Sequence, residues 1–127
     1  MTRYVVTLPW PDPVLRSNSR VHWALKARAV KSARHAAFWA AREAKVPCIP
    51  DATIFIEYYP KAYREDRQNV PASLKAAIDG IADAMGCDDK GFRVDYPTEW
   101  AGKRDPGEVV FRIDGTASGI GATCNWS

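Results

Sequence analysis

Two short stretches of the chain mix carboxylates with strong cations. The first has the sequence REDRQN at positions 64–69, and the second runs from Lys75 through Asp79 to the pair Asp88-Asp89. Carboxylate oxygens suit a hydrated magnesium ion, while lysine and arginine side chains bind phosphate oxygens. Together the two stretches predict a divalent metal acting on a phosphodiester bond.

The second stretch is open to two interpretations. Lys75, Asp79 and Asp83 follow one another at intervals of four, which places them on one face of a helix. They could form ordinary surface ion pairs, each worth a few tenths of a kcal/mol. Alternatively, Lys75 faces a phosphate while Asp79 orients its ammonium group. Asp88-Asp89 is also ambiguous, because turns favour aspartate for backbone reasons alone.

Charge is distributed unevenly along the chain, although the net charge is only +3 at pH 7. Positions 15–50 hold eight Lys or Arg residues and the single acid Glu43, whereas positions 65–95 hold seven acids and four cations. A basic part beside an acidic pocket is expected where one holds nucleic acid and the other a metal. Two solvated faces of opposite charge would give the same pattern.

A long helix is predicted from about Val21 to Lys45, because this alanine-rich segment has neither Gly nor Pro. Its apolar residues recur every three or four positions, and we expect Trp23, Ala27, Val30, Ala33, Ala37, Ala41 and Ala44 to form the buried stripe. A basic face remains, formed by Lys31, Arg34, His35, Arg42 and Lys45, with Phe38 and Trp39 nearby. That face could lie along a phosphate backbone, or could simply be solvated. Trp23 and Trp39 are expected to anchor the core rather than to stack on bases.

The remaining elements complete a single α/β (α+β) domain in the order β-α-β-α-β-β, with a small mixed sheet of about four strands. A shorter second helix should begin near Pro71, with Asn69 as its cap, and run to about Met85, where Gly86 ends it. Its apolar face comprises Leu74, Ile78, Ile81 and Met85. The predicted strands are Arg3–Leu8, Ala52–Tyr59, Phe92–Trp100 and Glu108–Ile113. The domain is predicted to span 1–113, followed by a mobile tail at 114–127.

Several classes of protein are disfavoured by the composition. No stretch approaches the roughly 18 consecutive apolar residues of a membrane span, and the first residues lack the apolar run of a signal peptide. Cys48, Cys87 and Cys124 are odd in number and include no Cys-x-x-Cys pair. Neither a disulfide framework nor a thiolate zinc site is therefore indicated, and we predict reduced thiols in a cytosol.

The order of these motifs resembles the RusA-type Holliday junction resolvases, small dimeric endonucleases of bacteria that are often encoded by phages and prophages. The similarity extends roughly from Tyr4 to Ile113 as scattered motifs. Those motifs are Leu8-Pro-Trp-Pro11, the segment with Asn18, Arg20, His22 and Trp23, Asp66 with Asn69, the run KAAIDG from Lys75, and Asp88-Asp89. The resemblance implies that Asp66 and Asp89 are catalytic metal ligands and that Lys75 is the essential lysine.

This chain departs from the commonest pattern of that family at two places. Gln68 stands where a second aspartate is usual, and Asn69 lies six positions before Lys75, a longer interval than the commonest form has. A neutral amide oxygen can coordinate magnesium but adds no charge, so metal affinity should fall. The missing carboxylate could come from Glu65, Asp79, Asp88 or a partner subunit. The predicted metal set is therefore Asp66, Asp89, Gln68, Asp88 and Asp79, with Mg²⁺ as the cofactor and Mn²⁺ as a possible substitute.

The resemblance implies a magnesium-dependent endonuclease of the bacterial cytoplasm that resolves four-way DNA junctions by paired symmetric nicks, working as a homodimer. The residues predicted to contact DNA are Asn18, Arg20, Lys26, Lys31, Arg34, Arg64, Arg67 and Asn69. One alternative is a catalytically weak or inactive protein that binds branched DNA and lost the chemistry through Gln68. Another is a phage accessory protein whose partner is a protein.

Overall fold

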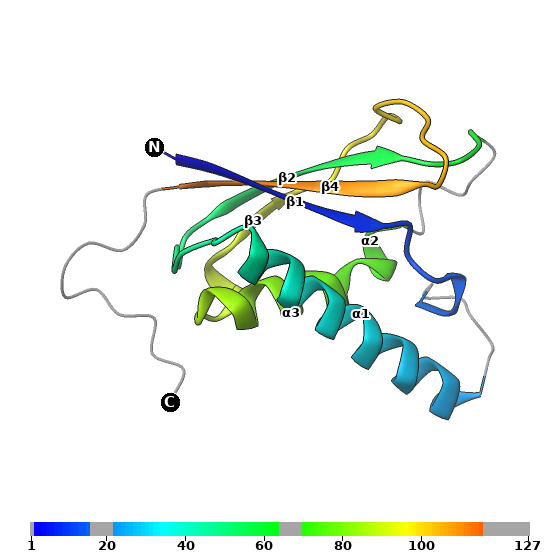
Figure 1. Ribbon diagram of the computed structural model, residues 1–127, viewed down its shortest axis with the longest axis horizontal. Coiled ribbons are helices and arrows are strands. Elements are labelled where there is room, and N and C mark those ends of the chain that lie inside the picture. The colour runs from blue at the N-terminus through cyan, green and yellow to red at the C-terminus, as the bar shows by residue number, and fades with distance from the viewer. Residues whose placement is uncertain (1, 16–21, 64–69, 116–127) are drawn as a thin grey trace.

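The protein is a layer of helices packed on one face of a sheet (Figure 1). The computed structural model describes residues 2–15, 22–63 and 70–115. Its elements are β1 (Thr2–Pro9), the 3₁₀ helix η1 (Pro13–Leu15), α1 (Trp23–Glu43), β2 (Thr53–Tyr59), α2 (Val70–Ser73), α3 (Lys75–Met85), the 3₁₀ helix η3 (Asp89–Gly91), β3 (Arg93–Asp95) and β4 (Glu108–Gly115). This arrangement confirms the predicted mixed α+β fold.

The sheet has four strands in the order β1-β4-β2-β3. β4 runs antiparallel to both β1 and β2, whereas β3 pairs in parallel with the other edge of β2. Register places Phe111 of β4 opposite Val6 on one side and Ile56 on the other. All three side chains are buried, which gives the sheet a continuous apolar face for the helices to cover.

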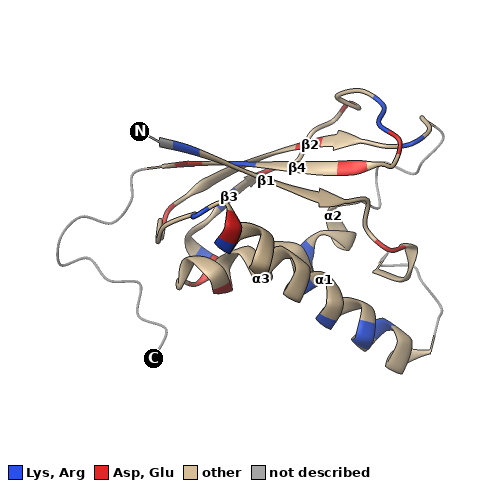
Figure 2. Cartoon of the chain, viewed as in Figure 1, with Lys and Arg blue, Asp and Glu red and all other residues tan. Residues whose placement is uncertain are grey.

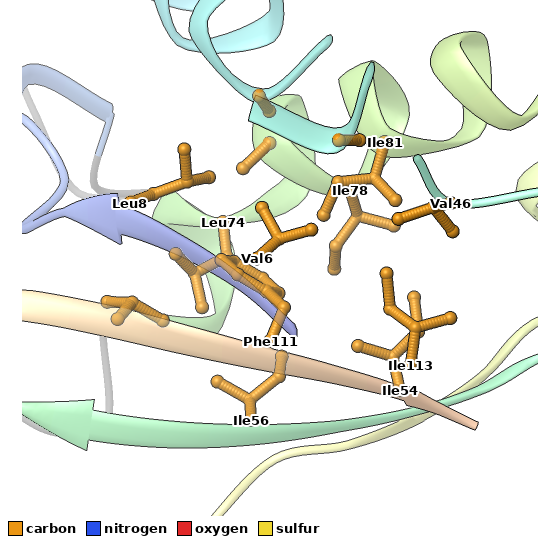
Figure 3. Close-up of a cluster of buried hydrophobic side chains, with 14 of the residues drawn as sticks. Val6, Leu8, Val46, Ile54, Ile56, Leu74, Ile78, Ile81, Phe111 and Ile113 are labelled. Carbon is orange, nitrogen blue, oxygen red and sulfur yellow. The ribbon is translucent and has the colours of Figure 1, made fainter. Parts of the chain in front are cut away.

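The core lies between this face and α3 (Figure 3). The predicted apolar face of the second helix is confirmed, since Leu74, Ile78, Ile81 and Met85 are all buried. Full burial of such a side chain contributes about 1.5–3 kcal/mol, so this row holds α3 firmly against the sheet. The helical segment begins at Val70, close to the predicted start at Pro71, but it is divided at Leu74 into α2 and α3.

The fully buried residues of α1 are confined to its C-terminal half. Of the predicted stripe, Ala37 and Ala41 are buried, whereas Trp23, Ala27 and Val30 are exposed. The N-terminal half extends beyond the elements that would cover it (Figure 1). Trp39 is also 57% exposed, so the expectation that both tryptophans anchor the core is wrong. A helical period shows which residues share a face, but not how far along the helix the core reaches.

Contact between α1 and α3 depends on a glycine. A Cβ added to Gly80 would lie 2.1 Å from the backbone oxygen of Arg34, so the two helices approach backbone to backbone at this point. Any larger residue would force the helices apart. The spacing between α1 and the middle of α3 is therefore set by a main-chain contact.

Two strand predictions need correction. The strand expected at Phe92–Trp100 is limited to β3, which pairs with β2 over three positions only. β4 continues past Ile113 into the predicted tail, where the carboxylate of Asp114 accepts hydrogen bonds from Arg3 at 2.5 and 2.7 Å. The remaining tail, 116–127, lies outside the described residues.

The cysteines behave differently from one another. Cys87 is a free, buried thiol, whereas Cys48 is disulfide-bonded, so the prediction of reduced thiols is wrong for Cys48. Within the described ranges, no helix has both the length and the hydropathy needed to cross a membrane.

Candidate active site

The predicted lysine stands at the first position of α3, and a tight turn brings an aspartate back to it. Gly86 ends α3 in the left-handed conformation, with φ of 76°, and its N–H donates to the carbonyls of Ala82 and Asp83. The chain then reverses into η3, where the Asp88 carboxylate accepts a hydrogen bond from the Lys90 N–H at 3.0 Å. Asp88 therefore caps the short helix that carries Asp89.

The turn is fixed from outside as well. A Cβ on Gly91 would lie 2.3 Å from the backbone oxygen of Pro50, so η3 packs directly against the main chain that precedes β2. The Arg93 N–H then donates to the carbonyl of Ala52, and β3 joins the sheet. Asp89 is thus held between the end of α3 and the edge of the sheet.

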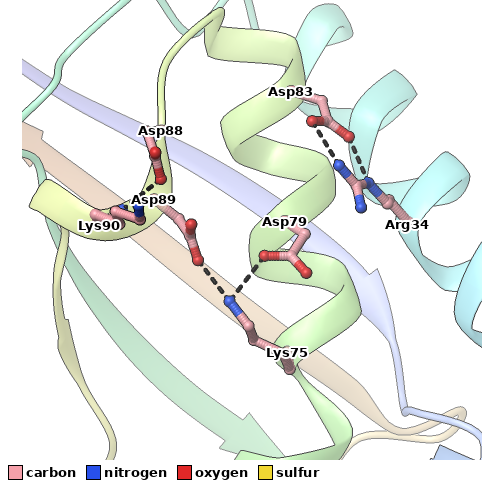
Figure 4. Close-up of polar contacts among 7 residues, drawn as sticks. All are labelled: Arg34, Lys75, Asp79, Asp83, Asp88, Asp89 and Lys90. Carbon is pink, nitrogen blue, oxygen red and sulfur yellow. Dashed lines mark hydrogen bonds and ion pairs between the residues drawn. The ribbon is translucent and has the colours of Figure 1, made fainter.

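Three charged side chains meet at this place, and we call them the lysine cluster: Lys75, Asp79 and Asp89. The Lys75 Nζ donates to Asp79 Oδ1 at 2.9 Å and to Asp89 Oδ2 at 2.5 Å (Figure 4). Lys75 and Asp79 are one helical turn apart, as the spacing predicted. Asp89 is 14 positions from Lys75 and reaches it only because the chain turns back.

Hydrogen bonding within the cluster stabilises its charged forms. The bonds to Asp89 and Asp79 raise the pKa of the Lys75 ammonium, although partial burial opposes them. The bond from Lys75 lowers the pKa of Asp89. Lys75 is therefore protonated at neutral pH and cannot act as a base. It can act as a fixed positive charge for an anionic oxygen.

Tyr96, just after β3, is a neighbour that the sequence did not indicate. Burial raises the pKa of its hydroxyl, while the charge on Lys75 acts in the opposite direction, so the hydroxyl lies within the field of the cluster. Nothing in the local sequence marks this tyrosine. Cys87 is close in sequence, but burial raises the pKa of its thiol, which makes it a poor nucleophile.

The Arg34 side chain forms an ion pair with α3. Its guanidinium donates to both carboxylate oxygens of Asp83, from Nε at 2.6 Å and from Nη2 at 2.9 Å (Figure 4). This bidentate bond is the first cause of its raised pKa, and the charges of Asp79 and Asp89 add to the effect. Arg34 was predicted to contact DNA, and here two of its donors hold α1 against α3.

Lysines and arginines are spread along α1 (Figure 2). Lys31 is exposed and Lys26 is partly buried. Arg28 is exposed one turn before Lys31 and was not among the residues predicted to contact DNA. Arg28 lies three positions before Lys31, which places both on one helix face, so this spacing could have identified Arg28 as a further DNA contact.

The other predicted site residues lie outside the described residues. They are Asn18, Arg20, Arg64, Glu65, Asp66, Arg67, Gln68 and Asn69. Asn69 directly precedes α2, and Lys75 follows within six positions. The roles assigned to these residues remain predictions.

The carboxylates of the lysine cluster are of the type that magnesium binds. Two carboxylates, from Asp79 and Asp89, converge on one cation, and carboxylate oxygens are the ligands that Mg²⁺ prefers. Within the described ranges, no group of three or more acidic, histidine or cysteine side chains is close enough to hold a metal. Asp66 and Gln68, which were also predicted as ligands, lie in the segment 64–69, outside the described residues.

Comparison with known proteins places the chain in a family. An uncharacterized protein of Xylella fastidiosa (strain Temecula1 / ATCC 700964) is 40% identical over 116 residues, which cover 87% of this chain and 75% of that protein. The chain belongs to the family of this protein. A stretch of that extent necessarily includes α3, η3 and nearly all of α1. No family model matches the chain.

Proposed function

We propose that the protein is a magnesium-dependent, structure-specific endodeoxyribonuclease that resolves four-way (Holliday) DNA junctions. It would make paired symmetric nicks during DNA recombination and repair or phage DNA processing. One observation supports this most: Lys75 and Asp89, the lysine and one of the acids that the resemblance implies, are hydrogen-bonded at 2.5 Å. A lysine held by carboxylates beside a basic helix suits a phosphodiester substrate.

Lys75 binds the scissile phosphate in this proposal. Its side chain is 65% exposed, and an ammonium has three donors, so one remains for a nonbridging or leaving oxygen while Asp79 and Asp89 hold the side chain in place. Asp89 and Asp66 would hold Mg²⁺, with Gln68, Asp88 and Asp79 as further candidate ligands. When bound, the metal supplies charge stabilisation and an activated water.

The cations of α1 supply affinity for DNA. Contacts with phosphates carry no sequence information, but they release counterions, so binding should weaken steeply with salt. A four-way junction has twofold symmetry, and a homodimer would place one lysine cluster on each of two opposed strands. The proposed setting is the bacterial cytoplasm.

A nicking assay tests the proposal. The native protein, at rising Mg²⁺ and in parallel with Mn²⁺, is incubated with a synthetic four-way junction and with a linear duplex of the same sequence. We expect paired nicks in the junction only. Asp89→Asn should abolish nicking while leaving binding intact or tighter, because one negative charge near the phosphates is lost.

Two other results would point elsewhere. Binding to the junction without nicking in either metal would favour the alternative of an inactive branched-DNA-binding protein. Absence of salt-dependent binding to any branched DNA would contradict both, and would favour a protein partner.

A further inference from the structure

The side of α1 that faces away from the core carries an aromatic residue among cations. We call this side the outer face; its members recur every three or four positions and are all exposed: Arg28, Lys31, Ser32, His35, Trp39 and Arg42. It lies opposite the buried residues Ala37 and Ala41. The outer face therefore plays no part in folding the core.

Trp39 is held in one orientation although it is 57% exposed. Its Nε1–H donates to His35 Nε2 at 2.7 Å. Its ring is parallel to that of Phe38 within 5°, with ring centroids 5.2 Å apart, and the guanidinium of Arg42 lies 5.7 Å from the Phe38 centroid. These contacts all come from α1 itself. An exposed ring that is already oriented loses little conformational freedom when a flat partner binds it.

The cations around this ring are available to a ligand. Arg28, Lys31 and Arg42 form no ion pair with any acid in the described part of the chain, in contrast to Arg34. Arg28 and Lys31 line an open cavity of about 550 Å³; the one acid among its described lining residues is Asp83, which Arg34 already binds. The ligand that fits is a polyanion.

Chemistry favours one kind of polyanion. A protein partner would need several acids placed to match these cations. Single-stranded nucleic acid offers phosphates for the cations and a flat base for an exposed aromatic ring. The combination on the outer face matches that pattern.

We propose that Trp39 stacks on an unpaired or unstacked base of DNA while Arg28, Lys31 and Arg42 bind the flanking phosphates. The inference rests on the proposed function and adds a site to it: four-way junctions interrupt base stacking at the branch point, whereas linear duplexes do not. Trp39 would thus contribute to the choice of branched over linear DNA. The remaining affinity would come from phosphates alone.

Fluorescence anisotropy of a labelled junction, a matched linear duplex and a dT₁₂ strand tests this, without divalent metal and over a range of salt. Trp39→Leu should weaken binding to the junction and to dT₁₂ about tenfold, and binding to the duplex much less. Trp39→Phe should retain most of the affinity, because a phenyl ring also stacks. Salt dependence should be unchanged in both variants, because no charge is lost.

Leu25→Ala is the matched control, because it removes a 49% exposed apolar side chain from the same helix without removing a ring. It should bind all three DNAs as the native protein does. Circular dichroism melts of each variant show that the fold is kept, as expected for exposed positions.

The outcomes separate the two proposals. If the native protein binds no DNA, the proposed function fails and the inference fails with it. If the native protein binds and nicks the junction and Trp39→Leu binds as well as native, only the stacking site is overturned. A change of oligomeric state in Trp39→Leu, measured by sedimentation, would also overturn it and assign the outer face to a protein interface.

Discussion

The lysine cluster and the outer face of α1 are both rich in charge, but they use it differently. In the cluster the cation is satisfied within the chain, since Lys75 bonds to Asp79 and Asp89, and Arg34 nearby bonds to Asp83. On the outer face, Arg28, Lys31 and Arg42 have no acidic partner among the described residues. Paired charges fix geometry, whereas unpaired charges attract a ligand. The first region therefore suits chemistry and the second suits affinity.

Removing the lysine should have the largest effect. We expect Lys75→Ala to lower the single-turnover nicking rate of a junction at least about 100-fold, because a fixed charge at the reacting phosphate is lost. Junction affinity should change about threefold or less. Lys90→Ala, which removes a neighbouring lysine outside the cluster, is the control and should keep the native rate. An unaffected rate in Lys75→Ala would end the catalytic assignment.

Removing two unpaired cations should affect binding rather than chemistry. Arg28→Ala combined with Lys31→Ala should reduce the slope of log K against log salt by about 2 and weaken binding about tenfold or more at low salt. At saturating protein the nicking rate should stay native. A rate loss at saturation would show that the outer face and the lysine cluster are not separate in function.

Removing the acid that pairs with Arg34 should give this arginine the same role as the unpaired cations of the outer face. Asp83→Ala leaves Arg34 without its carboxylate partner, so we expect affinity for DNA to rise about two- to threefold. Stability should fall by about 1 kcal/mol or less, since this ion pair is substantially exposed. Salt-dependent binding and urea unfolding of the same preparation measure both effects. Weaker DNA binding at native stability would contradict the distinction between paired and unpaired cations.

The smallest effect concerns pH. Because Lys75 lowers the pKa of Asp89 in the folded state, the ionised carboxylate stabilises the fold above its unfolded pKa of about 4, and this contribution is lost as pH falls through the folded pKa. Conversely, the raised pKa of Lys75 stabilises the fold below its unfolded pKa of about 10.4 and is lost only at higher pH. The pair thus contributes between about pH 4 and 10.

Urea unfolding at pH 7 and pH 3 measures this contribution. The native protein should lose more stability on acidification than Asp89→Asn, by at most about 1 kcal/mol, because Lys75 is largely exposed. Asp114 has a pKa lowered by Arg3 in the same direction, but it is common to both proteins and cancels in the difference. Equal acid sensitivity would show that the bond between Lys75 and Asp89 adds nothing to stability.

Local patterns in the sequence predicted local features well. The apolar face of α3, its end at Gly86 and the contact between Lys75 and Asp79 all depend on residues within a few turns of one another. Their causes are helical period and the left-handed conformation that glycine allows. The same holds for β1, where the predicted strand lies within the observed one.

Features that depend on distant segments were predicted less well. Trp23, Ala27 and Val30 were expected in the core because the period of α1 was extended over the whole helix, whereas the structure buries only Ala37 and Ala41 of that stripe fully. The contact of Asp89 with Lys75 required the turn at η3, which Gly91 and Pro50 fix through a close main-chain approach. Patterns within a few residues of Lys75 or Asp89 do not predict this contact.

The glycine at the crossing of α1 and α3 also limits how relatives of this protein can vary. Because the backbone of Arg34 leaves no room for a Cβ at Gly80, no side chain there can be enlarged or trimmed to adjust the helix spacing. Substitution can change the charge, aromatic content and length of α1 freely at exposed positions. The position of that helix relative to α3, in contrast, is fixed by main-chain geometry. Substitutions on the exposed side of α1 can therefore change which ligand binds there without changing where α1 lies relative to Lys75.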